Sequence, residues 1–259
     1  MDKPKEEKLS LNAHLEELRK RLIFILIAVG IGLCACYIAR EWLFAIITRP
    51  LTMVLPQKSY MIFTSLPEAF CTYMKISFFA ALVLTSPYTL YQIWKFISPG
   101  LYPGEQKYVL PFVISSSLLF VGGVLFGYFL ALPPAFNFFV SFSSDFLKPM
   151  LSLNEYLSLS LRFLLGFGLA FELPVFIFFM TKIGLVNAAK LSRGRRYAIL
   201  VIFIVAAILT PSPDAVTQIL MAVPLIFLYE VSIIVAKFAK KRPGAEEEGE
   251  AKEVKEEAR

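Results

Sequence analysis

Long apolar runs alternate with short polar segments along most of this chain. A run of about 18 or more apolar residues is long enough to cross a bilayer as a helix. The pattern predicts an all-α polytopic membrane protein in which residues 22–235 form a single domain of six transmembrane helices. The predicted spans are about 22–39, 66–97, 106–132, 153–180, 197–209 and 215–235.

Local signals mark where several of these helices begin and end. Residues 65–68 (Ser-Leu-Pro-Glu) and 152–155 (Ser-Leu-Asn-Glu) are capping boxes, which predict helix starts. The segment 98–105 contains two Pro-Gly steps, which are typical of a tight connection. Two longer loops are expected: 40–64, with prolines as helix breakers, and the Phe-rich 133–151, packed on the membrane surface.

The predicted spans differ in length. Spans 66–97 and 106–132 are long for a bilayer, which predicts a tilt, a kink at Pro87 or a projection beyond the membrane. Span 197–209 has thirteen residues, about 20 Å at about 1.5 Å per residue, against a hydrocarbon core of about 30 Å. Spans 5 and 6 are both expected to be short, which thins the bilayer locally or requires partner helices.

Charged segments flank the six-helix domain. Residues 1–21 are predicted to form a cytoplasmic arm with an amphipathic helix lying on the membrane surface. The apolar stripe of that helix is Leu11, Leu15, Leu18 and Leu22. The arm is charged and lacks the pattern of a cleaved signal peptide. Residues 236–259 mix acids and lysines, and we expect them to form a disordered cytoplasmic tail.

Composition and charge agree with this topology. Hydrophobic residues make up 57% of the chain and charged residues 18%, which is too apolar for a soluble domain of this length. Of the 26 Lys and Arg residues, 20 fall in the two terminal segments and around the connections near 95–107 and 181–196. The positive-inside rule therefore predicts that both termini are cytoplasmic. The formal charge of +6 is spread over loops and does not form a patch for nucleic acid.

No pattern of an enzyme active site occurs in the chain. Its one histidine, His14, lies in the arm and is interpreted as a surface residue. There is no HExxH, GxSxG, GxGxxG or phosphate-loop pattern and no cluster of metal-ligand residues. The cysteines Cys34, Cys36 and Cys71 lie in or beside apolar segments and are interpreted as small hydrophobic residues. We therefore expect neither catalytic residues, nor a cofactor, nor a bound metal.

One acid lies inside a predicted span. Between Phe163 and Met180 every residue is apolar or glycine except Glu172 and Pro174. A carboxylate at the centre of a membrane helix costs roughly 2.5–3.5 kcal/mol, and Pro174 predicts a bend just after it. Glu172 is therefore a candidate functional residue, because no local role offsets this cost.

Three other acids have an ordinary structural interpretation beside a functional one. Glu17 and Arg21 are spaced i, i+4 and can pair within the arm helix. Glu105 lies at the start of a predicted helix, where the helix dipole favours an acid. Asp214 can cap the helix at 215–235. The residues alone leave both interpretations open.

Four motifs occur in order along the chain: HLEELRKRL (14–22), YQIWKFISPGLYPGEQKY (91–108), FGLAFELP (167–174) and TPSPDAVTQILMAVP (210–224). Together they resemble TatC, the multispanning subunit of the twin-arginine protein translocase, over about residues 9–240. The turn Thr-Pro-Ser-Pro-Asp is one residue longer than in some members. The alignment that assigns a family role to Asp214 must therefore skip one residue.

The resemblance implies a receptor in the inner membrane of a bacterium for folded precursor proteins whose signal peptides carry paired arginines. Members act in homo- and hetero-oligomers with TatA/TatB-type single-span subunits, use the proton-motive force and need no cofactor. By position, Glu17 and Glu105 would be the signal-binding carboxylates, since carboxylates hold guanidinium groups through charge-assisted hydrogen bonds. The residues that would shape the surrounding surface are Arg19, Arg21, Phe96, Pro99 and Leu101.

The resemblance also implies roles inside the membrane. Glu172 would lie on a concave wall, within reach of the apolar segment of the signal or of a polar residue of a partner helix. Asp214, Gln218 and the short last spans would border the docking site for TatA/TatB-type partner helices.

Two other classes of function fit parts of the sequence. A proton- or cation-coupled small-solute transporter would use Glu172 as its coupling site, but the cytoplasmic motifs would then have no role. Solute uptake into liposomes by the purified protein, lost in Glu172→Ala, would identify such a transporter. A purely structural membrane anchor leaves the cost of Glu172 unexplained.

Overall fold

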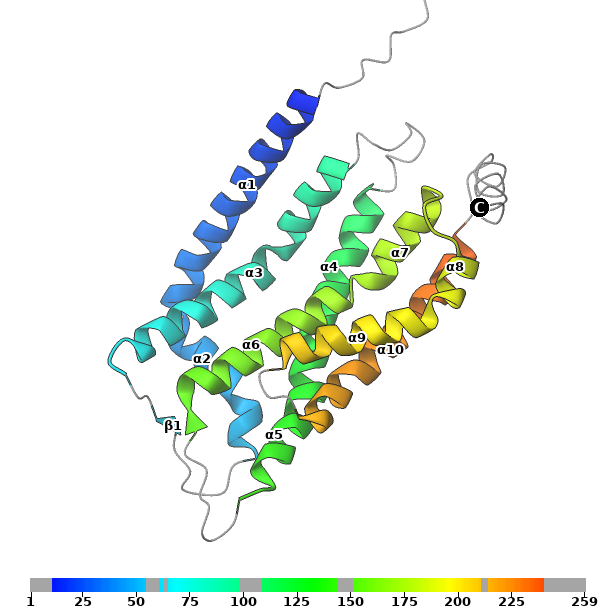
Figure 1. Ribbon diagram of the computed structural model, residues 1–259. Helices are drawn as coiled ribbons and strands as arrows, with labels where there is room; N and C mark the ends of the chain where they lie inside the picture. The colour runs from blue at the N-terminus through cyan, green and yellow to red at the C-terminus, as the bar shows by residue number, and fades with distance from the viewer. Residues whose placement is uncertain are drawn as a thin grey trace, which may run out of the picture. The chain divides into compact units, whose positions relative to one another are not determined.

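The computed structural model describes residues 11–54, 61–62, 65–97, 109–143, 151–210 and 214–239, which are mainly helical (Figure 1). The chain divides into two compact units, residues 1–43 with 73–117 and residues 44–72 with 118–259. The charged tail beyond residue 239, for which disorder is predicted, lies outside the described residues.

Five helical segments in the described part of the chain are long and apolar enough to cross a membrane. They are His14–Ile38, Glu68–Ile97, Leu110–Val140, Leu153–Lys182 and Ala215–Phe238. These segments make the protein a polytopic helical membrane protein, as predicted. The remaining predicted crossing, 197–209, corresponds to helix α9 (Arg195–Leu209), whose 15 residues span about 22 Å. The six-span count and the side of the termini therefore stay predictions.

Helix α1 (Leu11–Ile38) corrects the prediction of a separate surface helix in the arm. The arm and the first span form one continuous helix, because no glycine or proline occurs between Leu11 and Ala28 to end it. At Gly32 a Cβ atom would lie 3.0 Å from the Thr85 side chain, so α1 approaches α3 (Glu68–Ile97) closely there.

Helix α3 begins at the predicted capping box. The Oε2 atom of Glu68 accepts a hydrogen bond from the Ser65 N–H at 3.2 Å. Pro87 lies inside α3 and cannot donate to the carbonyl of Val83, four residues earlier. The hydroxyl of Ser86 donates to that carbonyl instead, at 2.8 Å.

The loop predicted at 40–64 is wrong in its first part, where helix α2 (Arg40–Thr52) forms. Glu41 in its first turn and Arg49 in its last turn interact favourably with the helix dipole and so stabilise the helix. Pro50 lies in the last turn and leaves the carbonyl of Ile46 without its usual helical donor. The Tyr128 hydroxyl donates to this carbonyl at 2.7 Å.

The third long helical segment also continues beyond its predicted end at 132. Helix α4 (Val109–Phe126) passes through a π-helical turn, η3 (Gly127–Ala131), into α5 (Leu132–Val140). The Phe-rich segment is therefore partly helical. Its two prolines occupy the first turn of α5, directly after the π-helical turn, and their fixed φ of about −65° is compatible with a helix. Strands β1 (Met61–Ile62) and β2 (Leu151–Ser152) pair in parallel.

Helix α6 (Leu153–Ala170) provides much of the core of the second unit. Ser152 caps it through the Glu155 N–H, as predicted from the second capping box. Phe163, Phe167 and Leu157 of α6 have 0% exposure. At Gly123 of α4 a Cβ atom would lie 2.5 Å from the Phe167 carbonyl oxygen, so only glycine allows this approach.

The C-terminal helices complete the second unit. Helix α7 (Leu173–Lys182) ends at Gly184, whose φ of 81° and hydrogen bonds to the preceding turn form a Schellman motif. After α8 (Ala188–Arg193) and α9, helix α10 (Ala215–Phe238) packs mainly on α7 and α9. With 24 residues α10 is about 36 Å long, so the prediction that this last helix is short is wrong.

Candidate functional site

A cluster of side chains joins the first turns of α1 to the last turns of α3 within the first unit. On α1 the residues are spaced i, i+3 and i+7, and on α3 they are spaced i, i+4 and i+8, so each set lies on one helix face. We refer to the following as the α1–α3 cluster: His14, Glu17, Arg21, Tyr88, Gln92 and Phe96.

Arg21 is at the centre of the α1–α3 cluster. Its Nη2 atom donates to Glu17 Oε1 at 2.9 Å, and its Nη1 atom donates to Gln92 Oε1 at 3.1 Å. The Nε2 atom of Gln92 donates to the Tyr88 hydroxyl at 2.7 Å. Gln92 is buried, whereas the Glu17 side chain keeps 25% of its surface exposed. The network therefore holds a partly exposed carboxylate in a defined position.

An aromatic pair borders the same network. The rings of His14 and Phe96 stack with their centroids 4.4 Å apart and an interplanar angle of 19°. His14 is exposed and Phe96 is half-buried. The expectation that His14 is a surface residue is confirmed, but its ring also packs against a residue named as a candidate for binding.

The structure brings together three of the predicted signal-binding residues, Glu17, Arg21 and Phe96. Arg19 is exposed and lies on a different face of α1, two positions from Glu17. Pro99, Leu101 and Glu105 lie outside the described residues. Gln92 and Tyr88 were missed, although their spacing from Phe96 in one helix could have drawn attention to them.

Glu172 lies at the break between α6 and α7. It occupies the N-cap position of α7, its N–H donates to the Leu169 carbonyl at 3.1 Å, and its carbonyl accepts from the Phe176 N–H at 2.9 Å. The side chain is half-buried, and its Oε1 atom is shielded from solvent. An interruption of the helix is present, as predicted, but it falls at Phe171 and Glu172 and not just after Glu172, because the Pro174 ring clashes with the carbonyl of Ala170, four residues earlier, in a continuous helix.

Asp214 and Gln218 lie at the start of α10, and Gln218 connects this helix to α9. The Oδ1 atom of Asp214 accepts from the Thr217 N–H at 2.7 Å, which confirms the predicted cap of α10. Gln218 Nε2 donates to the carbonyl of Phe203 in α9 at 2.9 Å. Both residues therefore have a structural role at the α9–α10 junction.

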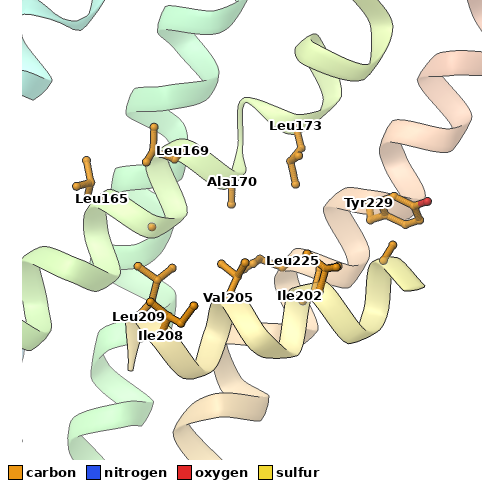
Figure 2. Close-up of a pocket in the computed structure, with 13 residues that line it drawn as sticks. Leu165, Leu169, Ala170, Leu173, Ile202, Val205, Ile208, Leu209, Leu225 and Tyr229 are labelled. Atoms are coloured by element: carbon orange, nitrogen blue, oxygen red, sulfur yellow. The ribbon is translucent and has the colours of Figure 1, made fainter. Parts of the chain in front are cut away.

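An apolar groove of about 540 Å³ lies in the second unit between α6, α7, α9 and α10 (Figure 2). Figure 2 shows side chains of α6 and α7, among them Leu165, Leu169 and Leu173, on one side and those of α9, among them Val205 and Leu209, on the other. Tyr229 of α10 lies at one end. Glu172 is not among the lining residues, although its neighbours Ala170 and Leu173 are.

The described residues offer groups for binding and give no sign of a metal centre. In that part of the chain no three His, Cys, Asp or Glu side chains lie close enough to hold an ion. The α1–α3 cluster instead presents a carboxylate, a guanidinium, an amide and an aromatic pair. Groups of these kinds recognise a peptide through charge, hydrogen bonds and apolar contact.

Comparison with known proteins agrees with this interpretation. A family model described as Sec-independent protein translocase protein (TatC) matches residues 13–224. The TatC protein of Desulforapulum autotrophicum is 49% identical over 244 residues, which cover 94% of this chain and 90% of that protein. The TatC protein of Carboxydothermus hydrogenoformans is 41% identical over 239 residues, which cover 92% of this chain and 96% of that protein.

The fold is also similar to a solved structure. A crystal structure described as the twin-arginine translocase receptor TatC superposes with a TM-score of 0.79 at 38% sequence identity, and the match covers 87% of this chain and 99% of that one. The extent of these matches along the chain, together with the helical membrane fold, shows that this chain belongs to the TatC family of Sec-independent protein translocase proteins.

Proposed function

We propose that this chain is the receptor subunit of a twin-arginine translocase in the inner membrane of a bacterium, with both termini in the cytoplasm. It binds paired-arginine signal peptides and, together with TatA/TatB-type single-span subunits, moves folded proteins across the membrane with the proton-motive force. The similar crystal structure is described as a receptor, and the relatives are described as translocase proteins, which supports the assignment.

The observation that carries the proposal is the held carboxylate of Glu17. One of its oxygens accepts from Arg21, and a carboxylate has about four acceptor positions in total. Its exposed part therefore has capacity for a guanidinium of the signal peptide, bound by a charge-assisted hydrogen bond. Arg21 keeps the carboxylate oriented, because the buried Gln92 fixes the other branch of its guanidinium.

The remaining signal-binding residues complete this surface in the proposal. Glu105 supplies the second carboxylate for the second arginine, and Arg19, Pro99 and Leu101 shape the surroundings. Phe96, stacked on His14, gives the apolar contact beside the charged pair.

Within the membrane, Glu172 is the polar contact for the apolar segment of the signal or for a polar residue of a partner helix. Its half-buried position at a helix break supports this role, since the break leaves polar backbone groups near the carboxyl. Asp214 and Gln218, at the junction of the short α9 with α10, border the docking site for TatA/TatB-type helices. The solute-transporter alternative is not retained, because the family is one of protein translocases.

Photocrosslinking tests the proposal. A paired-arginine signal peptide fused to a folded protein carries a photoreactive residue beside its arginines and is added to membranes containing the chain. Glu17→Gln combined with Glu105→Gln removes both carboxylate charges, and we expect the crosslinked product to fall by about tenfold or more, since each lost charge-assisted bond is worth roughly 1.5–3 kcal/mol.

Glu16→Gln is the matched control, because Glu16 is exposed and is displaced by one position from the helix face of Glu17. This variant should crosslink normally. All variants should insert into the membrane to the same extent. Equal crosslinking by the double variant and the unchanged protein would overturn the proposed receptor site.

A further inference from the structure

The apolar groove between α6, α7, α9 and α10 is open along a helix that is too short to cover the bilayer core. Gly166 and Leu209 both line it, and a Cβ atom added at Gly166 would lie 2.9 Å from Leu209 Cδ1, so the wall of the groove is closely packed at this point. Several residues along the groove are exposed despite being large and apolar, among them Leu169 (59%) and Ile208 (71%). The groove therefore faces a hydrophobic environment.

The volume of the groove limits which kind of molecule can occupy it. A volume of about 540 Å³ equals about 18 water molecules of roughly 30 Å³ each. A methylene group takes up nearly as much space as a water molecule, so the groove holds one long hydrocarbon chain. An α-helix about 10 Å across fills the same volume with only about five residues, so a membrane helix does not fit inside it.

One end of the groove meets a basic segment. The hydroxyl of Tyr229 donates to the Leu191 carbonyl in α8 at 2.9 Å, and a Cβ atom at Gly194 would lie 3.8 Å from that hydroxyl. The α8–α9 junction therefore closes the groove at Tyr229. Tyrosine at such a position is typical of the boundary between the hydrocarbon core and the headgroups.

The charges at this end are strongly positive. Residues 181–196 contain five Lys and Arg residues and no acid. Glu230 of α10 pairs with Arg195 at 2.8 Å and offsets one of these charges. Lys190, Arg193 and Arg196 are exposed. Basic groups beside a gap between membrane helices favour the phosphate of an anionic lipid.

We propose that this groove is a binding site for an anionic phospholipid. One acyl chain lies between α6 and α9, and the phosphate lies against the basic α8–α9 segment next to Tyr229. The bound lipid fills the gap beside the short helix α9 and seals its contact with the bilayer. The proposal concerns a ligand of the second unit and does not depend on signal-peptide binding.

Native mass spectrometry of the full chain, purified in mild detergent, tests the site. The probes are phosphatidylglycerol and phosphatidylcholine with identical acyl chains, supplied in equal amounts. We expect one phosphatidylglycerol per chain, retained roughly tenfold over phosphatidylcholine. Equal retention of the two lipids would overturn the proposal.

Variants of the groove and of its basic end separate the two parts of the site. Val205→Trp fills the groove and should abolish lipid retention, whereas Leu200→Trp, on an exposed face of α9 outside the groove, should leave it unchanged. Arg193→Gln combined with Arg196→Gln changes only exposed side chains and should remove the preference for phosphatidylglycerol.

Three results would count against the site. Lipid retention by Val205→Trp equal to that of Leu200→Trp would exclude the groove, and an unchanged preference in the double arginine variant would exclude the basic end. A photoreactive residue at position 205 should crosslink to lipid in membranes containing the whole translocase. Crosslinking to a protein helix there would also overturn the proposal.

Discussion

Single side chains determine how the two helices of the α1–α3 cluster are joined. Arg21 makes one hydrogen bond within its own helix and another to Gln92, 71 residues away. The planar guanidinium can do this because its donors point in fixed, separate directions, whereas the ammonium of lysine is a single point charge on a flexible stem. The identity of Arg21, rather than its charge alone, therefore fixes the position of the Glu17 carboxylate.

The close contact between α4 and α6 requires glycine at position 123, because the side chain there is a single hydrogen atom. Gly123→Ala places a methyl group 2.5 Å from the Phe167 carbonyl oxygen and 2.9 Å from the Phe171 side chain. The helices must move apart, and we expect a loss of stability of about 1–3 kcal/mol. Thermal unfolding of the purified protein in detergent measures it.

The neighbouring Gly122 is the control for this change, because an added Cβ atom meets nothing within 4 Å. Gly122→Ala should be neutral or stabilising, since alanine is favoured over glycine in a helix by about 1 kcal/mol. Equal losses for the two variants would show that helix flexibility, and not the close approach, makes glycine necessary.

At the scale of the helix, prolines interrupt hydrogen bonding without ending the element. Pro50 and Pro87 each remove one backbone donor, and a hydroxyl satisfies the carbonyl that is left. In hydrocarbon an unsatisfied carbonyl costs several kcal/mol, so these hydroxyls allow proline inside membrane helices. This pairing explains why Pro50, which was predicted to break the chain in a loop, lies inside α2, and why α3 continues through Pro87 as predicted.

Ser86→Ala tests this compensation in α3. Removing the hydroxyl leaves the Val83 carbonyl without the donor that replaces the Pro87 amide, and we expect a loss of about 1–3 kcal/mol in stability. Thermal unfolding in detergent should show a clear decrease in the midpoint.

Ser117→Ala is matched to it. The Ser117 hydroxyl donates to the Val113 carbonyl at 2.7 Å, but the amide of residue 117 donates to the same carbonyl in a regular helix. This variant should unfold within about 0.5 kcal/mol of the unchanged protein. If Ser117→Ala destabilised as much as Ser86→Ala, compensation for proline would not explain the role of Ser86.

At the scale of the whole molecule, topology depends on whether α9 crosses the membrane. Its 15 residues span about 22 Å, less than a hydrocarbon core of about 30 Å. The basic residues before it and in the tail favour the cytoplasm for both ends of the α9–α10 pair, which requires the pair to cross and return. The bilayer must then be thinner beside α9.

Cysteine labelling of intact cells distinguishes the topologies. In a chain without its native cysteines, single cysteines replace Ser141, Lys190, Ala215 or Lys237, and a membrane-impermeant thiol reagent is added. We expect labelling at positions 141 and 215 from outside, and at 190 and 237 only after permeabilisation. Labelling of position 237 from outside would show that α9 does not cross.

The candidate site could be predicted only in part. The motif around Glu17 and the i, i+4 pairing with Arg21 follow from residues close in the sequence, so both were evident before the fold was known. Gln92 and the stacking of His14 on Phe96 were not, because they depend on the packing of α1 against α3.

What the sequence by itself determined is local or compositional: the apolar segments that span a membrane, the capping boxes, the break at Glu172 before Pro174, and the motifs of the TatC family. These features follow from the conformational preferences of residues close in the sequence and from the apolar interior of the bilayer. The continuity of α1 also has a local cause, the absence of glycine and proline between Leu11 and Ala28, which the prediction overlooked. Only the tertiary structure decided that α2 and α5 are helical and that a groove lies beside α9. The helicity of α2 and α5 depends on donors and packing surfaces supplied by distant residues, as when Tyr128 satisfies the carbonyl of Ile46. No local pattern encodes such a contact.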